Sequence, residues 1–217
     1  MRKHALTNKP DRIVYWLIPL FLLGLGVAMG AVWTTHFLHL LQPSLQHIDA
    51  LAQRILRHGT PVQAIVTVFW NNARVALLMM GLGVFAGVFP MFTMWSNGLM
   101  MGVVTEAAAA QAHVPFWKVL LLGELPHGVF ELTALCWASS IGIRLAVAAI
   151  LSLWSLLAPA GTVGPGPLAA RSNPSDKRFQ RELVHAVERL PFIMAMLLVA
   201  ACIEITITPH LIELYRH

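Results

Sequence analysis

The sequence is poor in charge, and this shortage decides its class. Only 12% of its 217 residues are Asp, Glu, Lys or Arg, 57% are hydrophobic, and the mean hydropathy is +0.68. A soluble domain carries about 25% charged residues, because its surface must be hydrated. Apolar runs fill most of this chain, which excludes an ordinary soluble domain and a disordered one. The composition therefore predicts a single membrane domain over residues 1–217.

Cysteines are few, and the common catalytic motifs are missing. Cys136 and Cys202 both lie in apolar runs and form no CxxC pair, so we interpret them as small buried side chains. The sequence contains no HExxH or GxSxG motif, and it contains no Walker A or GxGxxG loop. These absences favour a protein without catalytic activity.

Basic residues gather in two places. Four lie in the first 12 residues, and a second group lies in a polar stretch further along the chain. Such flanking clusters follow the positive-inside rule, which predicts a bacterial or archaeal inner-membrane protein with a cytoplasmic N-terminus and a basic cytoplasmic loop at 161–190. The net charge of +5 therefore indicates the lipid bilayer as partner and not nucleic acid. The second group comprises Arg171, Lys177, Arg178, Arg181 and Arg189.

Apolar segments long enough to enter a bilayer recur along the chain. Residues 13–35 exceed the core of a signal peptide and match the roughly 20 residues of a membrane span. An even number of crossings must separate two cytoplasmic clusters, yet five apolar segments lie between them, so one segment should not cross. The expected segments are 13–35, 67–92, 97–110, 115–138, 142–158 and, after the basic loop, 191–208.

The segment around Pro126 is the best candidate for the one that does not cross. Pro126 and Gly128 disfavour a regular helix, and broken backbone at membrane depth must be buried in protein or line a cavity. We therefore expect an all-α polytopic protein with a re-entrant hairpin or half-helix near 116–138. Five helices would then cross, with the C-terminus outside. The alternative is six full crossings.

Two further segments have amphipathic patterns. Residues 44–60 show apolar side chains at helical spacing and end at Gly59 and Pro61, which predicts a helix on the outer membrane surface. Residues 179–190 show a similar pattern and predict a short helix leading into the last span.

Ionisable residues in apolar surroundings are the main functional candidates, because each costs roughly 2.5 kcal/mol or more at the bilayer centre. Pro126 suits the first turn of a new helix, with Glu124 just before that turn. His127 and Glu131 are then four residues apart on one helix face. Arg74, Lys118 and Arg144 are expected nearer the segment ends, from which they can snorkel. The candidates are Glu106, Glu124, His127, Glu131 and Glu204.

Three interpretations of this polar cluster are open. The Glu and His side chains could satisfy one another and tie a broken helix to its neighbours. They could form a metal site, since two carboxylates and an imidazole suit Zn²⁺, with Glu106 or Glu204 as a further ligand. They could also form a proton or ion pathway.

Amides and glycines mark expected helix contacts. Asn71, Asn72 and Asn97 are expected to bond between helices or to cap a helix. Gly83 and Gly87 form a GxxxG pair within the predicted span 67–92, which permits either a homodimer or packing within the chain.

The chain resembles the stage II sporulation protein M family. The shared pattern consists of Phe69-x-x-Asn72, Asn97-Gly98-x-x-x-Gly102 and Pro126-His127-Gly128-x-x-Glu131-Leu132, followed by Gly142. The resemblance covers about residues 65–208. It implies a polytopic membrane protein that, in sporulating members, serves as a scaffold for peptidoglycan-remodelling enzymes.

Three functions therefore stand as hypotheses. The first is a membrane scaffold without catalysis, which the resemblance favours. The second is a transporter of ions or small solutes, which a broken helix with buried ionisable groups would suit. The third is an intramembrane metalloenzyme, in which His127 with Glu124 or Glu131 would supply a metal ligand and a general base.

Overall fold

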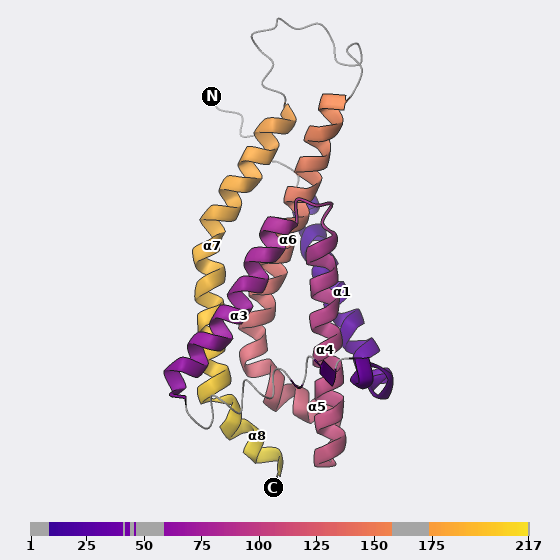
Figure 1. The fold of residues 1–217 in the computed structure, drawn as a ribbon, viewed down its shortest axis with the longest axis vertical. Coiled ribbons are helices and arrows are strands. Elements are labelled where there is room, and N and C mark those ends of the chain that lie inside the picture. The colour runs from indigo at the N-terminus through magenta and orange to yellow at the C-terminus, as the bar shows by residue number, and fades with distance from the viewer. Residues whose placement is uncertain (1–8, 41, 44–45, 47–58, 158–173, 217) are drawn as a thin grey trace, which may run out of the picture.

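The computed structural model describes residues 9–40, 42–43, 46, 59–157 and 174–216, which form helices and no strand (Figure 1). The all-α prediction is therefore confirmed for this part of the chain. The elements in chain order are α1 (Lys9–Val32), α3 (Pro61–Leu82), α4 (Val88–Ala112), α5 (Phe116–Val119), the π-helical segment η1 (Leu120–Glu124), α6 (Leu125–Leu157), α7 (Pro174–Thr206) and α8 (Thr208–Arg216).

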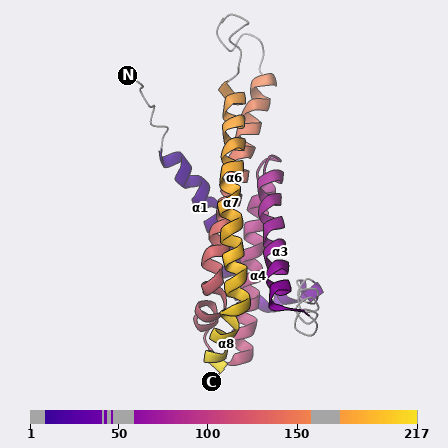
Figure 2. The ribbon, with the colours of Figure 1, turned by 90° about the vertical axis from the view of Figure 1, so that its left-hand side faces the viewer.

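Among the described residues, four helical segments are long and apolar enough to cross a membrane, which supports the prediction of a polytopic membrane protein. A fifth long helix, α4, lies alongside α1. Figures 1 and 2 show that α1, α4 and α7 run in one direction while α3 and α6 run in the other. The four segments are Ile13–Val32, Pro61–Leu82, Phe116–Trp154 and Arg178–Thr206.

The helix ends are compatible with five crossings, a number that stays a prediction. The first turns of α1 and α7 lie at the same end of the bundle, and α8 lies at the opposite end (Figure 2). The two basic clusters adjoin these first turns in the sequence. One side of the membrane can therefore accommodate both clusters.

Glycines hold α1 and α4 at backbone contact. A Cβ atom added to Gly98 would lie 2.1 Å from the carbonyl oxygen of Leu23, and one added to Gly102 would lie 2.2 Å from that of Val27. Gly26 and Gly30 of α1 face α4 equally closely. Only glycine permits this approach, as in the small-residue contacts of other membrane helices.

The predicted span 67–92 is wrong. Helix α3 begins at Pro61, after a capping box formed by Thr60 and Gln63, and it ends at Leu82. Residues 83–87 then turn the chain, with positive φ angles at Ala86 and Gly87. The hydrophobic run continues through the turn, so hydropathy alone does not show where the helix ends.

Gly83 and Gly87 therefore lie in the turn and not on one helix face. A Cβ atom at Gly83 would lie 2.4 Å from the Cα atom of Gly142 in α6. Gly87 has a φ of 70°, which a glycine adopts without strain. Gly83 thus serves packing within the chain, and Gly87 allows the turn.

The structure has no hairpin near 116–138. Elements α5, η1 and α6 form one continuous helical stretch, in which the irregularity is the π-helical turn Leu120–Glu124. Pro126 is the second residue of α6, but it lies inside this continuous stretch, so the predicted start of a new helix at Pro126 is wrong. The wider π turn before it relieves the clash that proline causes with the preceding turn of an α-helix.

Two other boundaries differ from the prediction. The expected short segment 97–110 is part of the longer helix α4, and residues 174–190 form the first half of α7 instead of a loop. The helix expected over 179–190 is present within α7. Almost all of the predicted amphipathic helix 44–60 lies outside the described residues.

Candidate functional site

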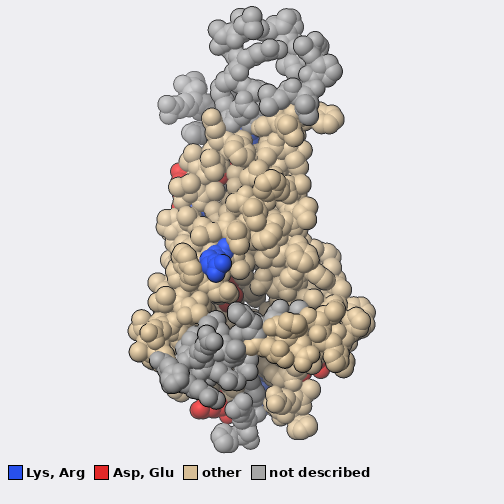
Figure 3. All heavy atoms as spheres, in the orientation of Figure 1, with Lys and Arg blue, Asp and Glu red and all other residues tan. Residues whose placement is uncertain are grey.

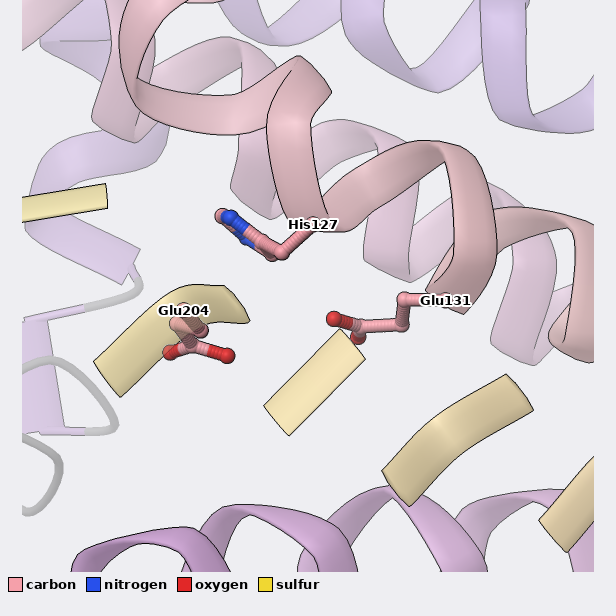
Figure 4. Close-up of side chains that lie close together, drawn as sticks. All are labelled: His127, Glu131 and Glu204. Atoms are coloured by element: carbon pink, nitrogen blue, oxygen red, sulfur yellow. The ribbon is translucent and has the colours of Figure 1, made fainter. Parts of the chain in front are cut away.

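The predicted polar cluster comes from two helices that run in opposite directions. Glu124 ends η1, His127 and Glu131 lie on the first two turns of α6, and Glu204 lies near the end of α7. Figure 4 shows His127, Glu131 and Glu204 near one another, between their helices. All four side chains are half-buried. The antiparallel pairing of α6 and α7 therefore adds Glu204 to the predicted pair on α6.

The three side chains are close enough to share one ion. One ligand atom each from His127, Glu131 and Glu204 lies within 4.8 Å of the other two. Glu124 adjoins the group, with its Oε2 atom 3.9 Å from Nε2 of His127. Within the described part of the chain, no Lys or Arg forms an ion pair with these three glutamates.

Thr208 lies within hydrogen-bond distance of the His127 ring. Its hydroxyl donates to the carbonyl oxygen of Ile203 at 3.4 Å and lies 3.3 Å from Nδ1 of His127. A hydroxyl has one proton to donate, so in this arrangement Thr208 accepts a hydrogen bond from Nδ1–H. The Nε2 atom then carries the free lone pair.

Glu106 does not join the cluster. It is half-buried near the C-terminal end of α4, and the group within metal-binding distance contains only residues of α6 and α7. Of the two further ligands considered from the sequence, Glu204 is therefore the one that the fold brings to His127.

The arrangement can do one of two things chemically. Carboxylates this close together in an apolar interior can share a proton, because two like charges repel strongly in such surroundings. They can instead bind a cation together with the imidazole. Proton sharing and cation binding are both consistent with a half-buried site that has Glu124 beside it.

A scan against protein-family models matches residues 17–209 to the family described as Stage II sporulation protein M. The chain belongs to the stage II sporulation protein M family. A search of curated proteins and a search of solved structures each find no significant match. The family match extends over every element from α1 to the start of α8, so it includes the whole polar cluster.

The amides of the stage II sporulation protein M pattern, and Gly128, have local surroundings in this structure, whereas Gly98, Gly102 and Gly142 contact other helices. Asn97 donates to the carbonyl oxygen of Thr93, one turn earlier in α4, and Asn71 donates to the side chain of Asn72 at 3.4 Å. Neither bonds between helices or caps a helix, which are the two roles expected from the sequence. A Cβ atom at Gly128 would make only an ordinary contact of 3.8 Å with Leu132.

Arg74 lies nearer the middle of its helix than the sequence predicts for this stage II sporulation protein M family member. In the predicted span 67–92 it lies near the start, but in α3 it is the fourteenth of 22 residues. It is exposed, and the described residues offer it no ion-pair partner. Arg144, by contrast, is paired with Glu182 of α7.

Figure 3 shows one conspicuous blue patch at mid-height, over the position of α3, with tan atoms around it. Arg74 is the single Lys or Arg of that helix. Only the position of the turn at 83–87 shows that Arg74 is central in its helix, and hydropathy does not reveal that turn.

Proposed function

We propose that the protein is a membrane scaffold that organises peptidoglycan-remodelling proteins. Membership of the stage II sporulation protein M family supports this role, since the scaffold function is what the family resemblance implies. Arg74, an exposed cation at the middle of α3, is the observation that carries the proposal. A binding partner within the membrane would neutralise it.

The energetic argument rests on where Arg74 lies. Eight residues, or about 12 Å of helix, separate it from the end of α3 at Leu82. A cation facing lipid at such a depth costs roughly 2.5 kcal/mol or more. A carboxylate on a neighbouring membrane helix would offset this cost by forming an ion pair in a medium of low dielectric constant.

The surface around Arg74 suits a second helix. Asn71, Arg74, Leu78 and Gly81 follow one another at helical spacing, and all four are exposed. We call them the α3 outer face. No atom lies within 4 Å of a Cβ added to Gly81, so another backbone can approach closely here, as small residues allow in membranes. The face therefore combines a charge, an amide and a small residue.

A photocrosslinking amino acid at Leu78 tests this function in native membranes. We expect covalent adducts with a membrane protein that carries an Asp or Glu in its span and acts on peptidoglycan. The matched control position is Phe21, which is exposed on α1 and should give lipid adducts alone. Lipid adducts alone at both positions would contradict the proposal, as would a partner unrelated to the cell wall.

A further inference from the structure

We propose that His127, Glu131 and Glu204 bind one divalent transition-metal ion, with Zn²⁺ as the ion that the ligands fit best. The proposal is independent of the scaffold function and rests on the geometry of the cluster. Their ligand atoms lie within 4.8 Å of one another. Bonds of about 2.0–2.1 Å to a tetrahedral zinc place its ligand atoms about 3.3 Å apart, so small side-chain adjustments would close the site.

The balance of charge favours a divalent ion. Two ionised carboxylates with a neutral imidazole carry a charge of −2, and isolated charges of this kind are costly to bury. No Lys or Arg of the described residues pairs with Glu131 or Glu204. One ion of charge +2 would make the group neutral, which a monovalent cation would not.

The hydrogen bonds of His127 prepare it as a ligand. Metal-binding histidines commonly donate their other ring N–H to a neighbouring acceptor, which fixes the tautomer and the ring orientation. Thr208 is placed to accept from Nδ1 because its own proton is directed to Ile203. The lone pair of Nε2 is then available to the metal.

Glu124 completes the surroundings of the site. Its Oε2 atom lies 3.9 Å from Nε2 of His127, which is near the spacing of two ligands on one ion. In its neutral, protonated form it can donate a hydrogen bond to a metal-bound water or hydroxide, which keeps the charge balance given above. A donor set of one imidazole nitrogen with carboxylate oxygens suits Zn²⁺ better than Ca²⁺ or Mg²⁺, which prefer oxygen alone.

Metal binding by the purified full-length chain in detergent tests the proposal. The protein is stripped with a chelator, and Zn²⁺ is then titrated by calorimetry and measured by mass spectrometry after gel filtration. We expect equimolar Zn²⁺ in the wild type. Glu131→Gln and Glu204→Gln should weaken binding by more than the roughly 10–100-fold that loss of a partner outside the ligand set costs.

Glu106→Gln is the matched control, because Glu106 is a half-buried glutamate of α4 outside the cluster. It should bind Zn²⁺ as the wild type does. Substitution with Co²⁺ gives a second readout, since coordination by the site should produce a visible absorption spectrum that either cluster variant changes.

Two results would overturn the proposal. One is a folded wild type, monodisperse on gel filtration, that retains no Zn²⁺ and gives no cobalt spectrum; the carboxylates would then be sharing protons. The other is equal binding in all variants, which would place the metal at histidines elsewhere. If a Gln variant does not fold, Glu124→Gln replaces it and should alter the cobalt spectrum.

Discussion

Two polar regions lie within the candidate membrane-spanning helices of this protein, and their charges have different surroundings. In the cluster of α6 and α7, an imidazole and carboxylates face one another, and Thr208 lies within hydrogen-bond distance of the ring. On the α3 outer face, Arg74 is exposed and has no counter-ion among the described residues. The first region can be neutralised by one small ion, whereas the second, in the proposed function, is neutralised by a carboxylate of another molecule.

Gly98 and Gly81 differ in a similar way, because one is packed against another helix of the chain and the other is not. Inside the bundle, Gly98 touches the backbone of α1, and an added Cβ would lie 2.1 Å from the oxygen of Leu23. On the α3 outer face, Gly81 has open space around it. Small residues thus seal a contact within the chain in one region and leave room for a contact in the other.

The largest expected effect is on the free energy of unfolding, which alanine should change in opposite directions at Gly98 and at Gly81. Gly98→Ala should lower the free energy of unfolding by roughly 1–3 kcal/mol, because α1 and α4 must move apart to admit the methyl group. Gly81→Ala should raise it by about 0.5–1 kcal/mol, because alanine favours the helix. Thermal unfolding in detergent measures both. Equal destabilisation would show that Gly81 is also packed within the chain.

The next largest effect concerns the charge of Arg74. Arg74→Glu should abolish the protein adduct formed by a crosslinker at Leu78, because two like charges would then meet in a medium of low dielectric constant. Arg74→Lys should retain the adduct, since it keeps the charge. Quantitative blotting of the adduct measures the change. Retention of the adduct in the Glu variant would mean that the partner binds by shape alone.

Exchange of charge would then test the contact directly. Once the partner carboxylate is identified, its substitution by Lys should restore the adduct to the Arg74→Glu chain. If the adduct is not restored although the wild type still binds the partner, the proposed ion pair is contradicted. The proposed scaffold function would still stand.

A smaller effect is expected at Thr208. Thr208→Val keeps the shape of the side chain but removes the acceptor for Nδ1–H of His127, so the Zn²⁺ affinity should fall roughly 10–100-fold. Calorimetric titration against the wild type measures it, with Thr206→Val as control, because the Thr206 hydroxyl bonds only within α7. An unchanged affinity would exclude Thr208 as the group that orients the ring.

The sequence predicts some of these features because they depend on local spacing. His127 and Glu131 are four residues apart, so any helix places them on one face. Pro126, by contrast, predicts the start of a new helix, whereas the π-helical turn before it lets the helix continue. The choice between Glu106 and Glu204 could not be made from the sequence, since it depends on how α7 is aligned against α6. The turn at 83–87 was missed because its residues are as apolar as the helices that it joins, and the central place of Arg74 was missed with it.

The last prediction is that the two regions act independently. Arg74→Gln should leave the Zn²⁺ affinity unchanged within error, and Glu131→Gln should leave the adduct at Leu78 unchanged, provided that both variants fold. The physical reason is that Arg74 forms no ion pair with a glutamate of the cluster. If Arg74→Gln instead weakened metal binding, or tightened it by removing a nearby positive charge, the arginine would be acting on the cluster through the apolar interior. The α3 outer face and the polar cluster would then form one extended site, in which a partner that neutralises Arg74 also controls the affinity for the metal.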